Sequence, residues 1–115
     1  MPLSFDPQSA PAIIRVFGEL DTLTSPELRE QIQQALAQRP PALLIDLAAV
    51  SFIDSSGLSA LVAGLKAAKL QGGTMVLFGL QPQARMIFSI TQADSLFEIA
   101  GSEAEAQALL TRGAV

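Results

Sequence analysis

The stretch FIDSSGLSAL, residues 52–61, lies where the hydrophobic pattern of the chain changes from that of a strand to that of a helix. Before it, ALLIDL (residues 42–47) is a continuous apolar run, as expected for a parallel strand that is buried on both faces. After it, large apolar residues recur at the spacing of one helix face: Leu58, Leu61, Val62 and Leu65. The pattern predicts a strand that leads straight into a helix.

The same alternation continues along the chain. Further strands are predicted at AIIRVFGEL (12–20) and TMVLFGL (74–80), with a weak edge strand at LFEI (96–99). Amphipathic helices are predicted within 24–41, where Pro40 and Pro41 end the helix, and within 82–90 and 102–111; LSFD (3–6) is expected to add an antiparallel edge strand. We therefore expect an α/β fold with a small mixed, mainly parallel β-sheet of four to five strands, flanked by about four helices.

Local signals predict how several of these helices begin and which side chains they bury. The first helix has two alternative starts: Ser25 as the N-cap before Pro26, or a capping box made by Thr24 and Glu27. Its apolar residues Leu28, Ile32 and Leu36 are expected to face the core, and so are Met86 and Ile87 of the third helix. Ser102 is predicted to cap the last helix, with Glu105 three residues further on.

Composition excludes several classes of function. The 115 residues suit one domain over 1–115, and no apolar run approaches the roughly 18 residues that a membrane span needs. The absence of Cys and His rules out disulfides, thiolate metal sites and Ser-His-Asp catalysis. The net charge of −4, with dispersed basic residues and no Trp or Tyr, disfavours direct nucleic-acid binding. No membrane insertion is expected, and the lack of a secretory signal predicts a cytoplasmic protein.

Motifs for bound cofactors and for catalysis are also missing. The sequence has no phosphate-binding loop, no dinucleotide fingerprint and no nucleophile elbow, and its acids are scattered rather than clustered for a metal. We therefore predict no cofactor and no metal, although a small nucleotide at the sheet edge stays open. An independent enzyme, such as a carboxylate-based hydrolase, is disfavoured because no paired acid and base can be identified.

The corner at residues 54–57 has a structural and a functional interpretation. Asp54, Ser55 and Ser56 are all able to cap a helix, and Gly57 would permit close packing in its first turn. One cap needs one side chain, however, and a glycine inside a helix costs about 1 kcal/mol relative to alanine. A helix N-terminus also tolerates an anion, so a serine there could carry a phosphate, with Gly57 leaving room for a kinase.

A second polar corner is predicted beside the first. GELD, residues 18–21, ends the strand at 12–20, and parallel strands end on the same edge of a sheet. If the two strands are neighbours, Asp21 would lie near Asp54. From spacing alone, Asp21 is also consistent with an ordinary acidic residue in a strand-to-helix loop.

Three stretches, GELDTLTSPELREQI (18–32), LLIDLAAVSFIDSSGLSALV (43–62) and residues 72–110, resemble a STAS domain, and more narrowly the bacterial anti-sigma factor antagonists. The resemblance follows the order of nearly the whole chain, and D-S-S-G-L at 54–58 is its most specific motif. It implies the same small, partly parallel sheet. Ser59 departs from the pattern, since many antagonists carry a second glycine there.

The resemblance implies a regulatory substrate rather than a catalyst. Unphosphorylated family members bind an anti-sigma factor that is also a serine kinase, and so free the sigma factor; phosphorylation releases them and a serine phosphatase resets them. Matched residue by residue, Ser56 is the phosphate acceptor and Ser55 the capping or supporting hydroxyl. Asp21, Asp54 and Gly57 would support the phosphosite or partner recognition.

Another class of function remains open for the same resemblance. A STAS subunit without a sigma-factor role could be a stress-signalling scaffold or the soluble component of a lipid or anion transport complex. Neighbouring genes for a serine kinase or for transporter subunits would distinguish these alternatives. The apolar composition allows either a monomer or a weak homodimer.

Overall fold

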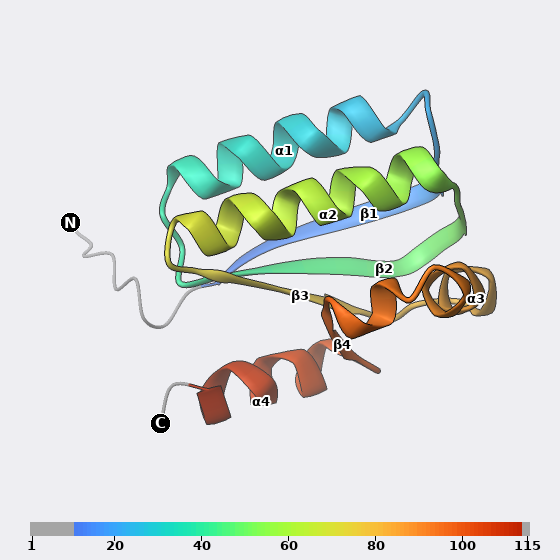
Figure 1. Ribbon diagram of the computed structural model, residues 1–115. Helices are drawn as coiled ribbons and strands as arrows, with labels where there is room; N and C mark the ends of the chain where they lie inside the picture. The colour runs from blue at the N-terminus through green and yellow to red at the C-terminus, as the bar shows by residue number, and fades with distance from the viewer. Residues whose placement is uncertain (1–10, 114–115) are drawn as a thin grey trace.

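The computed structural model describes residues 11–113, in which strands and helices alternate (Figure 1). Their bounds are β1 Ala12–Leu20, α1 Ser25–Ala37, β2 Ala42–Ile53, α2 Ser55–Leu70, β3 Thr74–Phe78, α3 Pro82–Ile90, the 3-10 turn η1 Ala93–Ser95, β4 Glu98–Ala100 and α4 Glu103–Gly113. The predicted α/β alternation is confirmed. Strand β2 is twice as long as the apolar run ALLIDL suggested, because it continues through AAVSFI to the corner.

The four described strands form one sheet in the order β1-β2-β3-β4, and every pair is parallel. Each strand is joined to the next by a connection that contains a helix, as parallel pairing requires. The antiparallel strand predicted at residues 3–6 lies outside the described residues. Between residues 11 and 113 the sheet is therefore parallel throughout. Its four strands are the lower number of the predicted four to five.

Helices α1 and α2 lie side by side over one face of the sheet, and α4 lies beneath the other (Figure 1). The larger core is between the sheet and the α1–α2 layer, and it includes the predicted inner residues Leu28, Ile32 and Leu36. A smaller core under α4 contains Leu44, Val76, Phe78, Ala100 and Ala106. Strand β2 contributes to both cores, which explains why apolar residues occupy both faces of its run ALLIDL apart from Asp46.

Helix α3 lies beyond the end of β3, beside the last part of β2, rather than over a face of the sheet (Figure 1). Its buried residues are Ala84 and Phe88, and the ring of Phe88 lies 5.6 Å from that of Phe97. Ile87 packs partly against the core, whereas Met86 is 55% exposed. The prediction of an inner position for Met86 was wrong, because the helix turns Ala84 and Phe88, one turn apart, towards the core.

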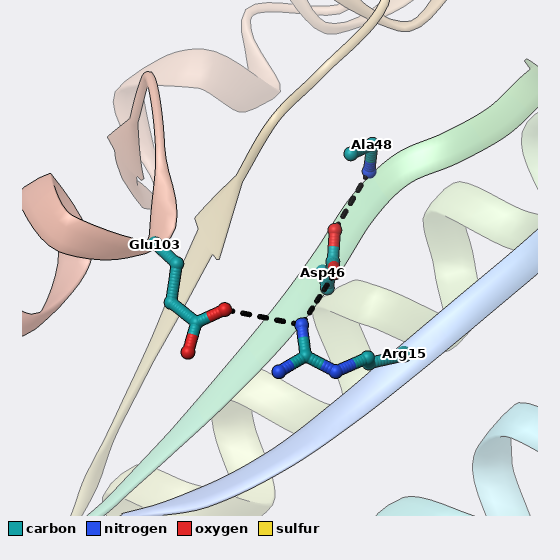
Figure 2. Close-up of polar contacts among 4 residues, drawn as sticks. All are labelled: Arg15, Asp46, Ala48 and Glu103. Carbon is teal, nitrogen blue, oxygen red and sulfur yellow. Dashed lines mark hydrogen bonds and ion pairs between the residues drawn. The ribbon is translucent and has the colours of Figure 1, made fainter.

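An ion-pair network links α4 to the sheet (Figure 2). The Arg15 guanidinium on β1 lies 2.7 Å from the Asp46 carboxylate on β2 and 3.1 Å from the Glu103 carboxylate on α4. Asp46 also accepts a hydrogen bond from the backbone N–H of Ala48 (2.9 Å). These bonds, first to Asp46 and then to Glu103, raise the pKa of Arg15. The network fixes the start of α4 over β1 and β2.

The first helix begins in neither of the two predicted ways. Its N-cap is Thr24, but the Thr24 side chain makes no capping bond and donates instead to the Glu19 carbonyl (2.7 Å). Ser25 is buried as the first helical residue, so its prediction as the N-cap was wrong.

None of the helices within residues 11–113 is both long and apolar enough to cross a membrane.

Candidate functional site

The corner between β2 and α2 is capped by Asp54, which directly follows the strand. Its backbone is extended, and its Oδ1 accepts a hydrogen bond from the Gly57 N–H (3.0 Å), the third residue of the helix. Ser55 is already helical and its side chain is exposed. The prediction of Ser55 as the cap was therefore wrong, because the capping side chain must come from the residue before the first helical one.

Gly57 brings the first turn of α2 into direct contact with the end of β1. A Cβ atom at this position would lie 2.4 Å from the backbone oxygen of Leu20 and 2.7 Å from its Cγ. Gly57 is buried, and its bare backbone makes this contact possible. Of the two interpretations of Gly57, the structure supports close packing.

Ser56 is half-buried in the same turn and faces the loop that follows β1. Its Oγ lies 3.1 Å from the Oγ1 of Thr22, close enough for a hydrogen bond in which either hydroxyl donates. Ser55, by contrast, is exposed. The two serines of the corner are thus distinguished by their surroundings: the Ser56 hydroxyl has a specific neighbour on another element.

Asp21 organises the loop that carries Thr22. Its Oδ1 accepts hydrogen bonds from the N–H groups of Leu23 (3.0 Å) and Thr24 (3.2 Å) and from the Thr24 hydroxyl (3.1 Å). This is an Asx-type turn, in which a carboxylate replaces a backbone acceptor. Asp21 therefore has a structural role in the loop. Because the same loop carries Thr22, Asp21 also helps to set the position of the hydroxyl that contacts Ser56.

The two corners lie together, as was expected if their strands were neighbours. Leu20 and Ile53 are paired across β1 and β2, and the Asp54 N–H donates to the Leu20 carbonyl (3.1 Å). Asp21 and Asp54 each follow one member of this pair. The structure therefore places both acids at the same edge of the sheet as Ser56.

Two residues of this site were missed by the sequence reasoning. Thr22 stands two positions after a strand end, and only the pairing of β1 with β2 reveals that it faces Ser56. Gln83 on α3 bonds to both backbone groups of Ile53, 30 residues earlier in the chain. The position of Thr22 directly after GELD was a weak sequence signal for a role at this edge. No nearby sequence feature indicates that Gln83 bonds to Ile53.

The chemistry of the corner suits the acceptance of an anion. The first turn of α2 contains no acidic residue, and its free N–H groups carry the positive end of the helix dipole. Within residues 11–113 no three acids are grouped so as to hold a metal ion. Beside the corner, Leu23 is 88% exposed and Phe52 is 41% exposed, which gives the polar site apolar surroundings.

Comparison with known proteins gives a consistent set of relatives. A sequence profile described as the STAS domain matches residues 5–106. The anti-sigma-B factor antagonist of Listeria monocytogenes is 35% identical over 80% of this chain and 81% of its own length, and that of Bacillus subtilis is 36% identical over 75% and 78%. The crystal structure of an anti-sigma factor antagonist from Mycobacterium paratuberculosis superposes with a TM-score of 0.79 at 31% identity, covering 86% of this chain and 84% of the other. The profile match spans all four described strands and the corner at residues 54–57.

Proposed function

The chain belongs to the STAS domain family, and we propose that it is an anti-sigma factor antagonist controlled by phosphorylation of Ser56. In its unphosphorylated form it binds an anti-sigma factor that is also a serine kinase, and thereby frees a sigma factor. Transfer of a phosphate to Ser56 breaks the complex, and a serine phosphatase restores the binding form. The protein acts as partner and substrate rather than as an enzyme, in the cytoplasm where transcription takes place.

The observation that carries this proposal is the position of the Ser56 hydroxyl. It lies in the first turn of α2, at the end of the helix that favours negative charge, and that turn has no acid of its own. A phosphate of about −1.5 to −2 charges can be added there without opposing the helix. The signal is then a change of surface rather than a loss of fold.

Release of the partner follows from charge. Asp54 is in the same corner and Asp21 organises the adjoining loop, so a phosphate on Ser56 adds to an acidic edge. The exposed Leu23 and Phe52 supply apolar contact area close to that edge. A partner that covers these residues would bury the new phosphate, at a high desolvation cost unless a cation pairs with it.

Two variants of Ser56 test the proposal once the partner is known. A pulldown with Ser56→Ala as bait is expected to recover a serine kinase of the anti-sigma factor type. Ser56→Ala should then bind this kinase as the wild type does, while Ser56→Asp should bind it at least about tenfold more weakly, since one carboxylate imitates part of the phosphate charge. Calorimetry measures both affinities, and Ser55→Asp is the matched control. Equal affinities for Ser56→Ala and Ser56→Asp would contradict release by charge.

A further inference from the structure

Strand β2 extends well past its neighbour β3. Pairing between them ends at Asp46 and Phe78, whereas pairing between β2 and β1 continues to Leu20 and Ile53. Residues 47–53 therefore lack a partner strand on the β3 side within the described sheet. Backbone N–H and C=O groups that lose a strand partner need other hydrogen bonds when water is excluded.

Two glutamines at the start of α3 take over this side of β2. The Gln81 Nε2 donates to the Ala48 carbonyl (2.8 Å). The Gln83 side chain bonds twice to Ile53: its Oε1 accepts from the Ile53 N–H (2.8 Å) and its Nε2 donates to the Ile53 carbonyl (2.9 Å). Through its amide nitrogen and oxygen, Gln83 makes the pair of bonds that an opposite residue of an antiparallel strand would make.

The Gln83 bonds hold the residue directly before the helix cap. On the other side of the strand, the Asp54 N–H is held by the Leu20 carbonyl (3.1 Å). Asp54 in turn caps Gly57, so a continuous chain of hydrogen bonds and peptide units runs from α3 through Ile53 to the first turn of α2. Ser56 belongs to that turn. The bond of Gln81 is to Ala48, five residues before Ile53 on β2, and is not part of this chain.

We propose that Gln83 is a positioning residue for Ser56: its two hydrogen bonds to Ile53 fix the end of β2, and so hold the first turn of α2 in the geometry in which Ser56 receives its phosphate. Phosphoryl transfer is sensitive to such placement, because catalysis of this reaction rests largely on the alignment of acceptor and donor. The inference deepens the proposed function and rests on it. Its structural part, control of the first turn, can be measured without a kinase.

Amide hydrogen exchange tests the structural part. Gln83→Met keeps the length of the side chain and removes both bonds, and Gln81→Met is the matched control, because Gln81 bonds to the same strand. In Gln83→Met the Gly57 N–H should exchange at least about tenfold faster than in the wild type, whereas in Gln81→Met it should stay within about twofold. Equal exchange of Gly57 in the two variants would overturn the proposal. Gln83→Asn, which keeps an uncharged amide but shortens its reach by one methylene, is the milder variant if Gln83→Met is unstable.

Phosphorylation kinetics with the captured serine kinase test the functional part. Gln83→Met should lower kcat about tenfold and change KM for the antagonist less than about twofold, because the acceptor is misplaced while the binding surface is kept. Gln83→Asn, which keeps the uncharged amide, should recover part of the rate. If the wild type is phosphorylated but Gln83→Met and Gln81→Met react at equal rates, the role of Gln83 is overturned and the proposed function still stands. A wild type that accepts no phosphate would instead contradict the proposed function, and the exchange comparison would still decide whether Gln83 holds the turn.

Discussion

Helices α2 and α4 begin in nearly the same way, yet only one of these starts is suited to a switch. Each helix follows a parallel strand, and each is capped by a side-chain oxygen that accepts from a backbone N–H three residues further on. The two bonds join Asp54 to Gly57 (3.0 Å) and Ser102 to Glu105 (3.2 Å), so the predicted cap of α4 is confirmed. Capping by itself therefore does not mark a functional site.

The difference between the two starts is in their charge. The first turn of α4 contains Glu103, paired with Arg15, and Glu105, which accepts from the Gly101 N–H (2.9 Å). Negative charge already complements this helix dipole. At the start of α2 the carboxylate is that of the cap, Asp54, and the first turn itself offers hydroxyls and no acid, so further charge can be added to it by modification.

The largest expected effect contrasts the glycines at the two starts. A methyl group at Gly57 would meet the backbone oxygen of Leu20 at 2.4 Å, whereas one at Gly101 would meet the flexible carboxylate of Glu105 at 3.0 Å. Gly57→Ala should lower the free energy of unfolding by about 2–3 kcal/mol. This is a net value, because the higher helix propensity of alanine offsets part of the steric cost. Gly101→Ala should change it by less than about 0.5 kcal/mol. Urea unfolding measures both, and similar values would break the contrast.

The caps should give a smaller effect. Asp54→Ala removes the bond to Gly57 in a part-buried corner, and should cost about 1–2 kcal/mol of unfolding free energy. Ser102→Ala removes an exposed bond, and should cost about 0.5 kcal/mol. Asp54→Asn, which keeps the acceptor oxygen, is the control for charge. If Ser102→Ala proves the more damaging of the two, the corner at α2 is not the better-anchored helix start.

The smallest effect concerns the second residue of each helix, Ser56 in α2 and Ala104 in α4. Ser56→Asp should leave the unfolding free energy within about 0.5 kcal/mol, because attraction to the helix dipole offsets repulsion from Asp54. Ala104→Asp adds a third acid to a first turn in which Glu103 and Glu105 already complement the dipole, and should destabilise by about 0.5 kcal/mol at low salt through repulsion among the three carboxylates. Thermal unfolding at low and high salt separates the two, since salt screens exposed charges. A destabilisation by Ser56→Asp alone would contradict the difference in charge.

Much of the fold and the position of the corner at residues 54–57 could be predicted from local patterns, whereas the assignment of Ser56 as the phosphate acceptor came from the family resemblance. The period of Leu28, Ile32 and Leu36 gave the inner face of α1, and the change of period at residues 52–61 gave the corner at its observed place. These features depend on residues a few positions apart, which share one helix turn or one strand. The same reasoning brought Asp21 and Asp54 to one edge, on the condition that β1 and β2 are neighbours.

The remaining features depend on contacts between distant segments or on competition among similar groups. The Thr22–Ser56 contact depends on the register between β1 and β2. The Gln83–Ile53 bonds form only because β2 extends past the end of β3. Asp54 rather than Ser55 is the cap, because a helix start one residue earlier or later changes which side chain can reach the N–H of the third helical residue. Composition cannot resolve such a shift.

The central claim is that this corner is a phosphorylation switch centred on one hydroxyl. The most direct test is to incubate the protein with the serine kinase that Ser56→Ala captures and with ATP, and to locate the phosphate by tandem mass spectrometry. The account predicts a single phosphate on Ser56 and none in the Ser56→Ala variant, with Ser55 unmodified. Phosphate on Ser55, Thr22 or another residue, or no transfer at all, would contradict it.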